Sequence, residues 1–247
     1  TLVTGLFMLL SRRSFRPNNL RQVVLRAVFN VTAVMLFFGG LQYTTVTNAN
    51  MLNMTYPAFV FLLAPFINAE KTRLRNIFYL LLTMAGVYLV VAPDFRNVNP
   101  GDLLSLASGL VAGFGIPFLR EARKYDSSEV IVFYLMLFGC LMSGVFLMWD
   151  CSVPRGMVAV YLLLSGVSAA LGQVLITIGY RYIEAAAGSL VSSSRIIFAG
   201  IMGVIIFADP FTAPILTGAL LILLSLMGVG GLWEKAGDWI KRRFGAA

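Results

Sequence analysis

One basic side chain, Arg195, lies near the middle of a long apolar stretch over residues 183–207. If that stretch is helical, Arg195 shares one face with Gly188, Ser192 and Ala199, because helical neighbours recur every three to four residues. A guanidinium on a small, polar face can bind a carboxylate or a phosphate through two parallel hydrogen bonds. The pattern therefore indicates recognition of an anion. The alternative is that Arg195 bonds helix carbonyls or nearby hydroxyls and only locks the helices together.

A repeat in the sequence extends this candidate site. The opening run TLVTGLFMLL corresponds to CLMSGVFLMW, which starts at Cys140, an offset of 139 residues (140 − 1 = 139). The same offset carries Arg195 back to Tyr56 and Ser192 back to Asn53. If the two copies face each other, these four side chains meet at the centre of the molecule and form a polar, substrate-binding cavity. The weaker candidates for the same cavity are Gln173 and Tyr43.

The composition indicates which elements position these residues. The chain has 247 residues, of which 59% are hydrophobic and 12% charged. Apolar runs of about 20 residues separated by short charged loops are typical of membrane-spanning helices. We therefore predict an all-α, polytopic membrane helix bundle with about eight to nine spans. The predicted spans are 27–46, 49–68, 76–92, 102–119, 129–149, 156–179, 183–207 and 213–232, with an incomplete one over 1–10.

The repeat also predicts the domain organisation. We expect a first, incomplete repeat over 1–93, a second over 101–232 and an amphipathic tail over 233–247. A second repeat that starts near Gly101 implies a first one that starts at position −38 (101 − 139), so about one and a half spans are expected upstream. Five spans are an odd number, so the second copy enters the membrane in the opposite sense.

The charges fit this inverted arrangement. The corner at Glu70 continues into basic residues, whereas the corresponding corner at Asp209 continues into Pro210 with no basic residue nearby. All but three of the 19 Lys and Arg fall on one side of the predicted bundle, Arg26 among them. The positive-inside rule places that side, with the carboxyl terminus, in the cytoplasm. The net charge of +8 is thereby explained without nucleic acid.

The stretch GGLQYTTVTNANMLNMTYPAFVFLLAPFINAEKTRLRNIFYLLLTMAGVYLV resembles the EamA-type repeat of the drug/metabolite transporter superfamily. The matching elements are Leu41 and Tyr43 of the turn, the central Pro57, Glu70 at the end of its helix, and Gly86. In the second copy Ile196 replaces the proline, Asp209 the glutamate and Ser225 the late glycine. The resemblance implies a ten-span fold whose first span this chain lacks, and a substrate among amino acids, nucleotide sugars, drugs and other metabolites.

We accordingly expect a multi-pass transporter in the plasma membrane, namely a bacterial inner membrane, that moves a small polar organic metabolite by alternating access. The solute is expected to be amino-acid-like or otherwise anionic or zwitterionic. The expected partners are this small-molecule substrate and the lipid bilayer, with no nucleic acid; a homodimer is left open. A non-transporting or inactive membrane subunit is the alternative.

A membrane-embedded enzyme is less favoured, because the sequence has no histidine and its 11 acidic residues fall in loops or at the ends of spans. Without a deep acid, a base or a pair of cysteines, we expect no catalytic residue, no cofactor and no metal. The same distribution offers no carrier for a proton relay, so facilitated diffusion or exchange is preferred over proton coupling.

Overall fold

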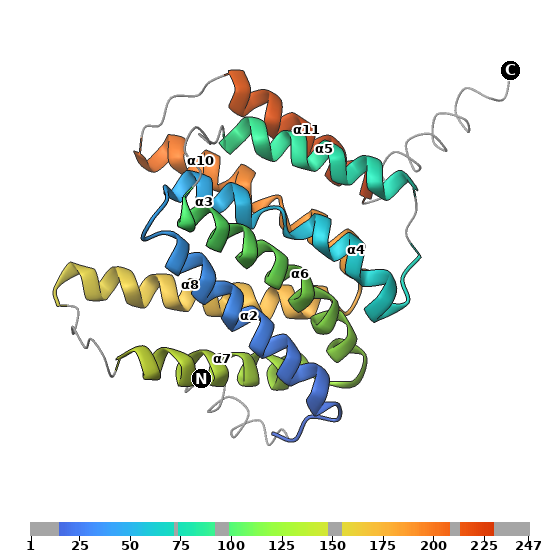
Figure 1. Cartoon of the computed structure of the whole chain (residues 1–247), viewed down its shortest axis with the longest axis vertical. Coiled ribbons are helices and arrows are strands. Elements are labelled where there is room, and N and C mark those ends of the chain that lie inside the picture. The colour runs from blue at the N-terminus through green and yellow to red at the C-terminus, as the bar shows by residue number, and fades with distance from the viewer. Residues whose placement is uncertain (1–14, 72–73, 92–98, 148–154, 208–212, 230–247) are drawn as a thin grey trace, which may run out of the picture.

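The computed structural model describes residues 15–71, 74–91, 99–147, 155–207 and 213–229, and all regular structure within these ranges is helical (Figure 1). The tail over 233–247, the incomplete span over 1–10 and Asp209 lie outside the described residues. The helices are α2 (Leu20–Gly40), α3 (Val46–Asn53), α4 (Tyr56–Asn68), α5 (Leu74–Val91), α6 (Pro100–Tyr125), α7 (Ser128–Leu147), α8 (Met157–Gly179), α9 (Ala185–Ser192), α10 (Arg195–Phe207) and α11 (Ala213–Val229).

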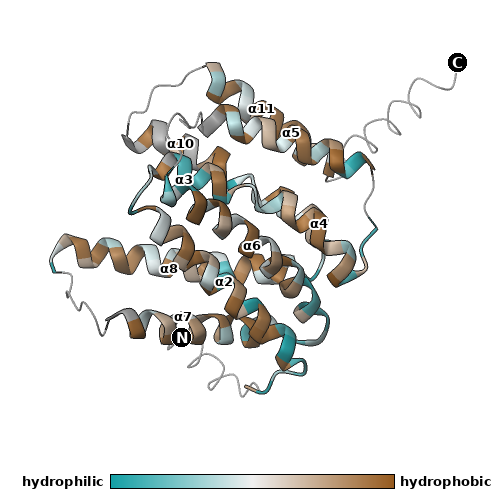
Figure 2. Ribbon diagram, viewed as in Figure 1, coloured by the Kyte–Doolittle hydropathy of each residue, from teal (hydrophilic) through white to brown (hydrophobic). Residues whose placement is uncertain are grey.

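Five stretches in the described part of the chain are long and apolar enough to cross a membrane. They are Leu20–Gly40, Asn48–Asn68, Pro100–Tyr125, Ser128–Val145 and Met157–Gly179. Figure 2 shows mostly apolar residues along the long helices, with hydrophilic residues on α3 and around the carboxyl end of α6. The chain is a membrane protein, as its composition predicts.

The first predicted span is wrong in its position. It was expected over 27–46, but α2 begins at Leu20 and ends at Gly40. The side chain of Asn19 accepts a hydrogen bond from the Gln22 amide at 3.3 Å and caps the helix, so the polar residues that follow belong to its first two turns. This shift moves Arg26 from a predicted loop into the helix.

Two predicted spans are broken near their centres. Residues 49–68 and 183–207 were each expected to form one helix, but α3 is separated from α4 at residues 54–55 and α9 from α10 at residues 193–194. At each break the amides bond three residues back, as Thr55 does to the Leu52 carbonyl at 3.2 Å and Ser194 to the Val191 carbonyl at 3.0 Å. Such tightened turns interrupt an α-helix and re-aim the side chains that flank them.

The two breaks have different causes. In the first copy Pro57 lacks an amide hydrogen, and its ring favours the first turn of a new helix, α4. At the second break Ile196 stands in place of proline, but serine hydroxyls bond back to carbonyls of α9, including Ser192 to Gly188 at 3.0 Å and Ser193 to Ser189 at 3.4 Å. Such bonds compete with the regular ladder and bend helices.

The helix bounds recur at the offset found in the sequence. Adding 139 to the bounds of α3 gives 185 and 192, which are the bounds of α9, and adding it to those of α4 gives 195 and 207, which are the bounds of α10. α2 and α8 end at residues 40 and 179, and α5 and α11 begin at residues 74 and 213. The same local structure is therefore formed twice.

α6 lies at the centre of the packing. Ser105, Gly109 and Gly113 recur every four residues and form a stripe of small residues that is buried along α6. A Cβ at Gly109 would lie 2.8 Å from the Leu52 carbonyl oxygen and 2.9 Å from the Thr55 Oγ1. The stripe thus lets the residues at the break between α3 and α4 contact the α6 backbone. Small residues commonly allow such close approach between helices in membranes.

α5 and α11 pair at one end of the molecule (Figure 1). The Thr83 hydroxyl donates to Ser225 Oγ at 2.7 Å, and the Ser225 hydroxyl donates to the Tyr79 carbonyl at 2.8 Å. Ser225, which replaces the late glycine of the second copy, thus joins the two helices by hydrogen bonds.

Candidate functional site

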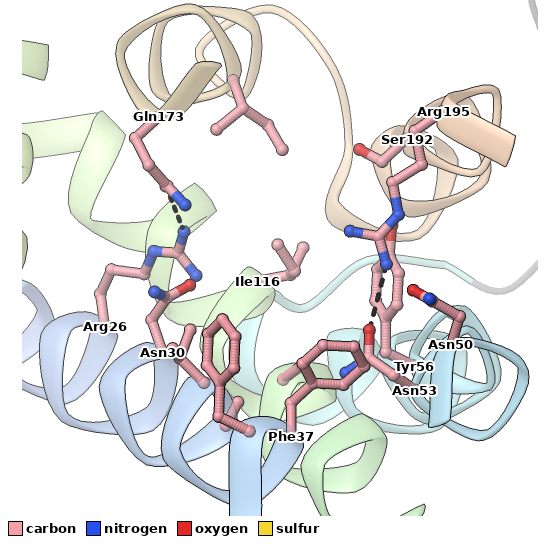
Figure 3. Close-up of a pocket in the computed structure, with 15 residues that line it drawn as sticks. Arg26, Asn30, Phe37, Asn50, Asn53, Tyr56, Ile116, Gln173, Ser192 and Arg195 are labelled. Atoms are coloured by element: carbon pink, nitrogen blue, oxygen red, sulfur yellow. Dashed lines mark hydrogen bonds between the residues drawn. The ribbon is translucent and has the colours of Figure 1, made fainter. Parts of the chain in front are cut away.

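A cavity of about 450 Å³ lies beside both helix breaks (Figure 3). Its walls come from α2, α3, α4, α6, α8, α9 and α10. The lining residues are Arg26, Asn30, Ala33, Val34, Phe37, Phe38, Asn50, Asn53, Tyr56, Ala112, Ile116, Gln173, Ile176, Ser192 and Arg195. They include two arginines and, within the described chain, no Asp or Glu.

Five of the six candidate residues line this cavity, and Tyr43 does not. Asn53 and Tyr56 flank the first break, Ser192 and Arg195 flank the second, and Gln173 comes from α8. The Tyr43 side chain is 60% exposed and lies in the turn that follows α2.

Arg195 contacts residues at the other break. Its Nη2 donates to Asn53 Oδ1 at 3.1 Å and approaches Met54 Sδ at 3.5 Å. The guanidinium carbon lies 5.8 Å from the centre of the Tyr56 ring, an arrangement that favours a cation. Arg195 thus joins the two breaks, and Figure 3 shows its guanidinium pointing into the cavity.

Asn53 is held in place by a chain of hydrogen bonds. Its Nδ2 donates to Ser108 Oγ at 2.8 Å, and the Ser108 hydroxyl donates to the Ala33 carbonyl at 2.8 Å. These bonds fix the amide so that its oxygen faces Arg195. α2, α6 and α3 therefore all contribute to the orientation of the guanidinium.

Tyr56 and Ser192 complete this side of the cavity. The Tyr56 hydroxyl donates to the Ser189 carbonyl of α9 at 3.2 Å, which leaves its ring against Arg195. The Ser192 hydroxyl donates to the Gly188 carbonyl, so its oxygen can still accept a hydrogen bond.

Arg26 forms a second cationic group on the opposite wall (Figure 3). The side chain is 3% exposed, its Nη2 donates to Gln173 Oε1 at 3.4 Å, and its Nε is buried without a hydrogen-bond partner. A Cβ at Gly115 would lie 3.2 Å from Nη1, so this glycine leaves room for the guanidinium. The sequence-based placement of Arg26 in a loop before the first span is therefore wrong.

Arg26 could have been found from the spacing of polar residues. Arg26 and Asn30 lie four residues apart on α2, and Ala33 follows three residues later. This is a small, polar helical stripe of the kind that singled out Arg195. The stripe was missed because the predicted span began one residue after Arg26.

A separate polar cluster joins the ends of α4, α6 and α9. The Glu70 carboxylate, just beyond α4, accepts hydrogen bonds from the amides of Ala185 at 2.7 Å and Ala186 at 3.2 Å. These amides open α9, where the helix dipole favours a negative charge. The cluster also includes Arg120, whose Nη1 donates to the Tyr180 carbonyl at 2.9 Å.

The Glu70 carboxylate is only partly solvated in this position. Burial raises its pKa above the ordinary value, and the two amide hydrogen bonds partly oppose that effect. The sequence placed Glu70 at the end of its helix, and the structure adds the contact of its carboxylate with the start of α9.

A multi-pass membrane bundle in which two broken helices flank a polar cavity has the architecture of a membrane transporter. The chain belongs to the EamA-like transporter family, whose model matches residues 1–92 and 99–231. The family resemblance seen in the sequence is thereby confirmed.

Individual relatives agree with this assignment. An uncharacterized transporter of Helicobacter pylori is 26% identical over 201 residues, which cover 77% of this chain and 67% of the relative. An uncharacterized transporter of Archaeoglobus fulgidus is 27% identical over 208 residues, with 81% and 73% covered. Solute carrier family 35 member G1 of Mus musculus is 24% identical over 220 residues and extends further, since the match covers 83% of this chain and 60% of that protein.

A solved crystal structure has the same fold. It matches with a TM-score of 0.79 at 15% identity and covers 95% of this chain and 84% of its own.

Proposed function

We propose that this protein moves a small polar organic solute, amino-acid-like or otherwise anionic or zwitterionic, across a bacterial inner membrane by alternating access. The observation that carries the proposal is the contact between Arg195 and Asn53. It joins two helix breaks that lie 139 residues apart, beside a cavity large enough for a metabolite. A site between two copies of a bundle is exposed to alternate sides when the copies exchange conformations.

The proposal includes two inverted five-span repeats with a cytoplasmic carboxyl terminus. The recurrence of helix bounds at the offset supports the duplication, and the charge difference between the Glu70 and Asp209 corners supports the inversion. Transport is proposed over catalysis because the transporter names of the relatives favour it, and because the lining residues include no nucleophile paired with a base.

Solute flux in reconstituted liposomes tests this function. We expect Arg195→Ala to reduce the rate of solute counterflow by at least about tenfold, because a charge-assisted hydrogen-bond donor to the solute is lost. Arg21→Ala is the matched control, since Arg21 is exposed in the first turn of α2 and does not line the cavity. Counterflow of anionic and zwitterionic solutes that is unchanged in Arg195→Ala contradicts the proposal, and the absence of flux in the wild type supports a non-transporting subunit instead.

A further inference from the structure

We infer that the cavity selects a solute with an anionic group at each end, such as a dicarboxylate or a carboxylate that also carries a phosphate or phosphonate. This inference rests on the proposed function and narrows its solute class. It excludes amino acids as the preferred solutes.

The first observation is that the cationic groups lie on opposite walls. Arg26 projects from α2 and contacts Gln173 of α8, whereas Arg195 projects from the start of α10 and contacts Asn53 of α3. Figure 3 shows both guanidinium groups facing the same cavity from opposite sides. Two sites for an anion are therefore present in one cavity.

The second observation is that, among the described residues, neither guanidinium group contacts a carboxylate. Gln173 and Asn53 are neutral amides, and the described lining residues contain no Asp or Glu. The Nε of Arg26 is buried with no acceptor. A buried cation without a counter-charge is costly in a membrane, so the cavity favours a solute that supplies the missing negative charge.

The number of charges determines which solute fits. A monoanion neutralises one arginine and leaves the other uncompensated. A zwitterionic amino acid does the same and also places its ammonium group in a cavity that already holds two cations and no acid. A solute with two anionic groups compensates both arginines, and each group can accept paired hydrogen bonds from a planar guanidinium.

The middle of the cavity is apolar, which suits a short carbon chain. Phe37 and Ile116 lie between the two guanidinium groups in Figure 3. Methylene groups gain free energy when they leave water for such a wall. The cavity thus offers two polar ends and an apolar middle, which match a dicarboxylate along its length.

A matched series of small acids tests the inference on the purified protein. Succinate, glutarate and adipate carry two carboxylates, and 3-phosphonopropionate replaces one of them with a phosphonate. Compared with succinate, butyrate has a methyl group in place of one carboxylate, and 4-aminobutyrate has an aminomethyl group, which is an ammonium at neutral pH. We expect at least one two-anion compound to raise the melting temperature at concentrations at which butyrate and 4-aminobutyrate do not. A comparison of 3-phosphonopropionate with succinate shows whether one end of the cavity prefers a phosphonate or a carboxylate.

Variants of Arg26 and Arg195 test whether each arginine binds one anionic group of the solute. Arg26→Gln and Arg195→Gln should each weaken binding of the two-anion compound by about tenfold or more and bring it close to that of butyrate. Arg26→Lys and Arg195→Lys, which keep the charge, should retain part of the preference and show that a loss is not due to misfolding. Arg21→Gln in the same helix as Arg26 is the surface control.

The outcomes separate this inference from the proposed function. If a two-anion compound binds but shows no counterflow in liposomes, the solute class stands and the transport function fails. If 4-aminobutyrate or butyrate binds and is transported as well as every two-anion compound, transport stands and the inference is overturned. It is also overturned if no compound of the series raises the melting temperature of the wild type.

Discussion

Asn53 is the residue on which the geometry of the site depends most. It accepts from Arg195 and donates to Ser108, so one amide links a helix break of the second copy to α6. An amide can make both contacts because it carries a donor and an acceptor side by side. A neutral partner orients Arg195 without neutralising it, and the charge remains available for a solute.

Replacing this amide with an acid tests the role of the free charge. Asn53→Asp should change the melting temperature little, because the ion pair that a carboxylate forms at 3.1 Å from Arg195 is offset by the loss of the amide donor to Ser108. It should also lower the affinity for an anionic solute by about tenfold, because the new carboxylate forms hydrogen bonds with the Arg195 guanidinium and repels the anionic group of the solute. Thermal unfolding with and without the solute measures both effects. Unchanged solute affinity in Asn53→Asp contradicts the assigned role of Arg195.

At this scale the repeat predicted more of the cavity than hydropathy did. The offset paired Asn53 with Ser192 and Tyr56 with Arg195, and all four line one cavity. Arg26 was missed because the predicted span began at residue 27, whereas α2 begins at Leu20, and this placed a buried arginine in a loop. An error of about two turns at a helix end changes the fold little, but it determines whether a charged side chain is assigned to a loop or to the cavity.

At the scale of the elements, broken helices distinguish the structure from the predicted spans. Each of the eight predicted spans overlaps helical structure in the described residues, but the first was placed seven residues too late, and two were expected as single helices where the structure has a break. Pro57 lies at the start of α4 after the first break, whereas the second break depends on serine hydroxyls that bond their own helix. Hydropathy does not register such bonds, because they change the backbone without changing the polarity of the segment.

The close contact between α6 and the first break can be tested by adding one methyl group. Gly109→Ala places a Cβ within 3 Å of the Leu52 carbonyl and Thr55 Oγ1, so we expect about 1–3 kcal/mol of lost stability and weaker solute binding. Gly144→Ala is the control, because no described atom lies within 4 Å of its Cβ position and alanine favours the helix. Equal melting temperatures for the two variants would mean that the close contact of Gly109 with Leu52 and Thr55 does not stabilise the structure.

The contact of Glu70 with α9 predicts a pH dependence. Burial raises the pKa of this carboxyl above the unperturbed value of 4.5, so the folded protein binds the proton more tightly than the unfolded chain. The resulting contribution to folding is complete below the unfolded pKa and is lost as the pH rises through the folded pKa. We therefore expect the melting temperature of the wild type to fall relative to that of Glu70→Gln as the pH is raised above 4.5. Parallel pH profiles of the two proteins are the contrary result.

At the scale of the whole molecule, α8 shows where the arrangement of the two copies differs. α2 is packed along α6, whereas α8 is exposed along most of its length in the described structure. The small residues of α2 that are buried, Ala27, Ala33 and Gly40, correspond at the offset to Gly166, Gly172 and Gly179 of α8. No described atom lies within 4 Å of the Cβ positions of those three glycines. The two copies of this helix therefore differ in packing within the described structure, since the face that is buried on α2 is exposed on α8.

The central claim, that one cavity between the two copies is opened to either side of the membrane in turn, is tested most directly at Ser192. This residue lines the cavity at the second break. Ser192→Cys, in a protein whose Cys140 and Cys151 are replaced by serine, can be labelled by a membrane-impermeant thiol reagent applied to one side of oriented vesicles at a time. We expect labelling from both sides and a several-fold slower rate from each side when the transported solute is present. Labelling from one side only, or a rate that the solute does not change, would contradict the account.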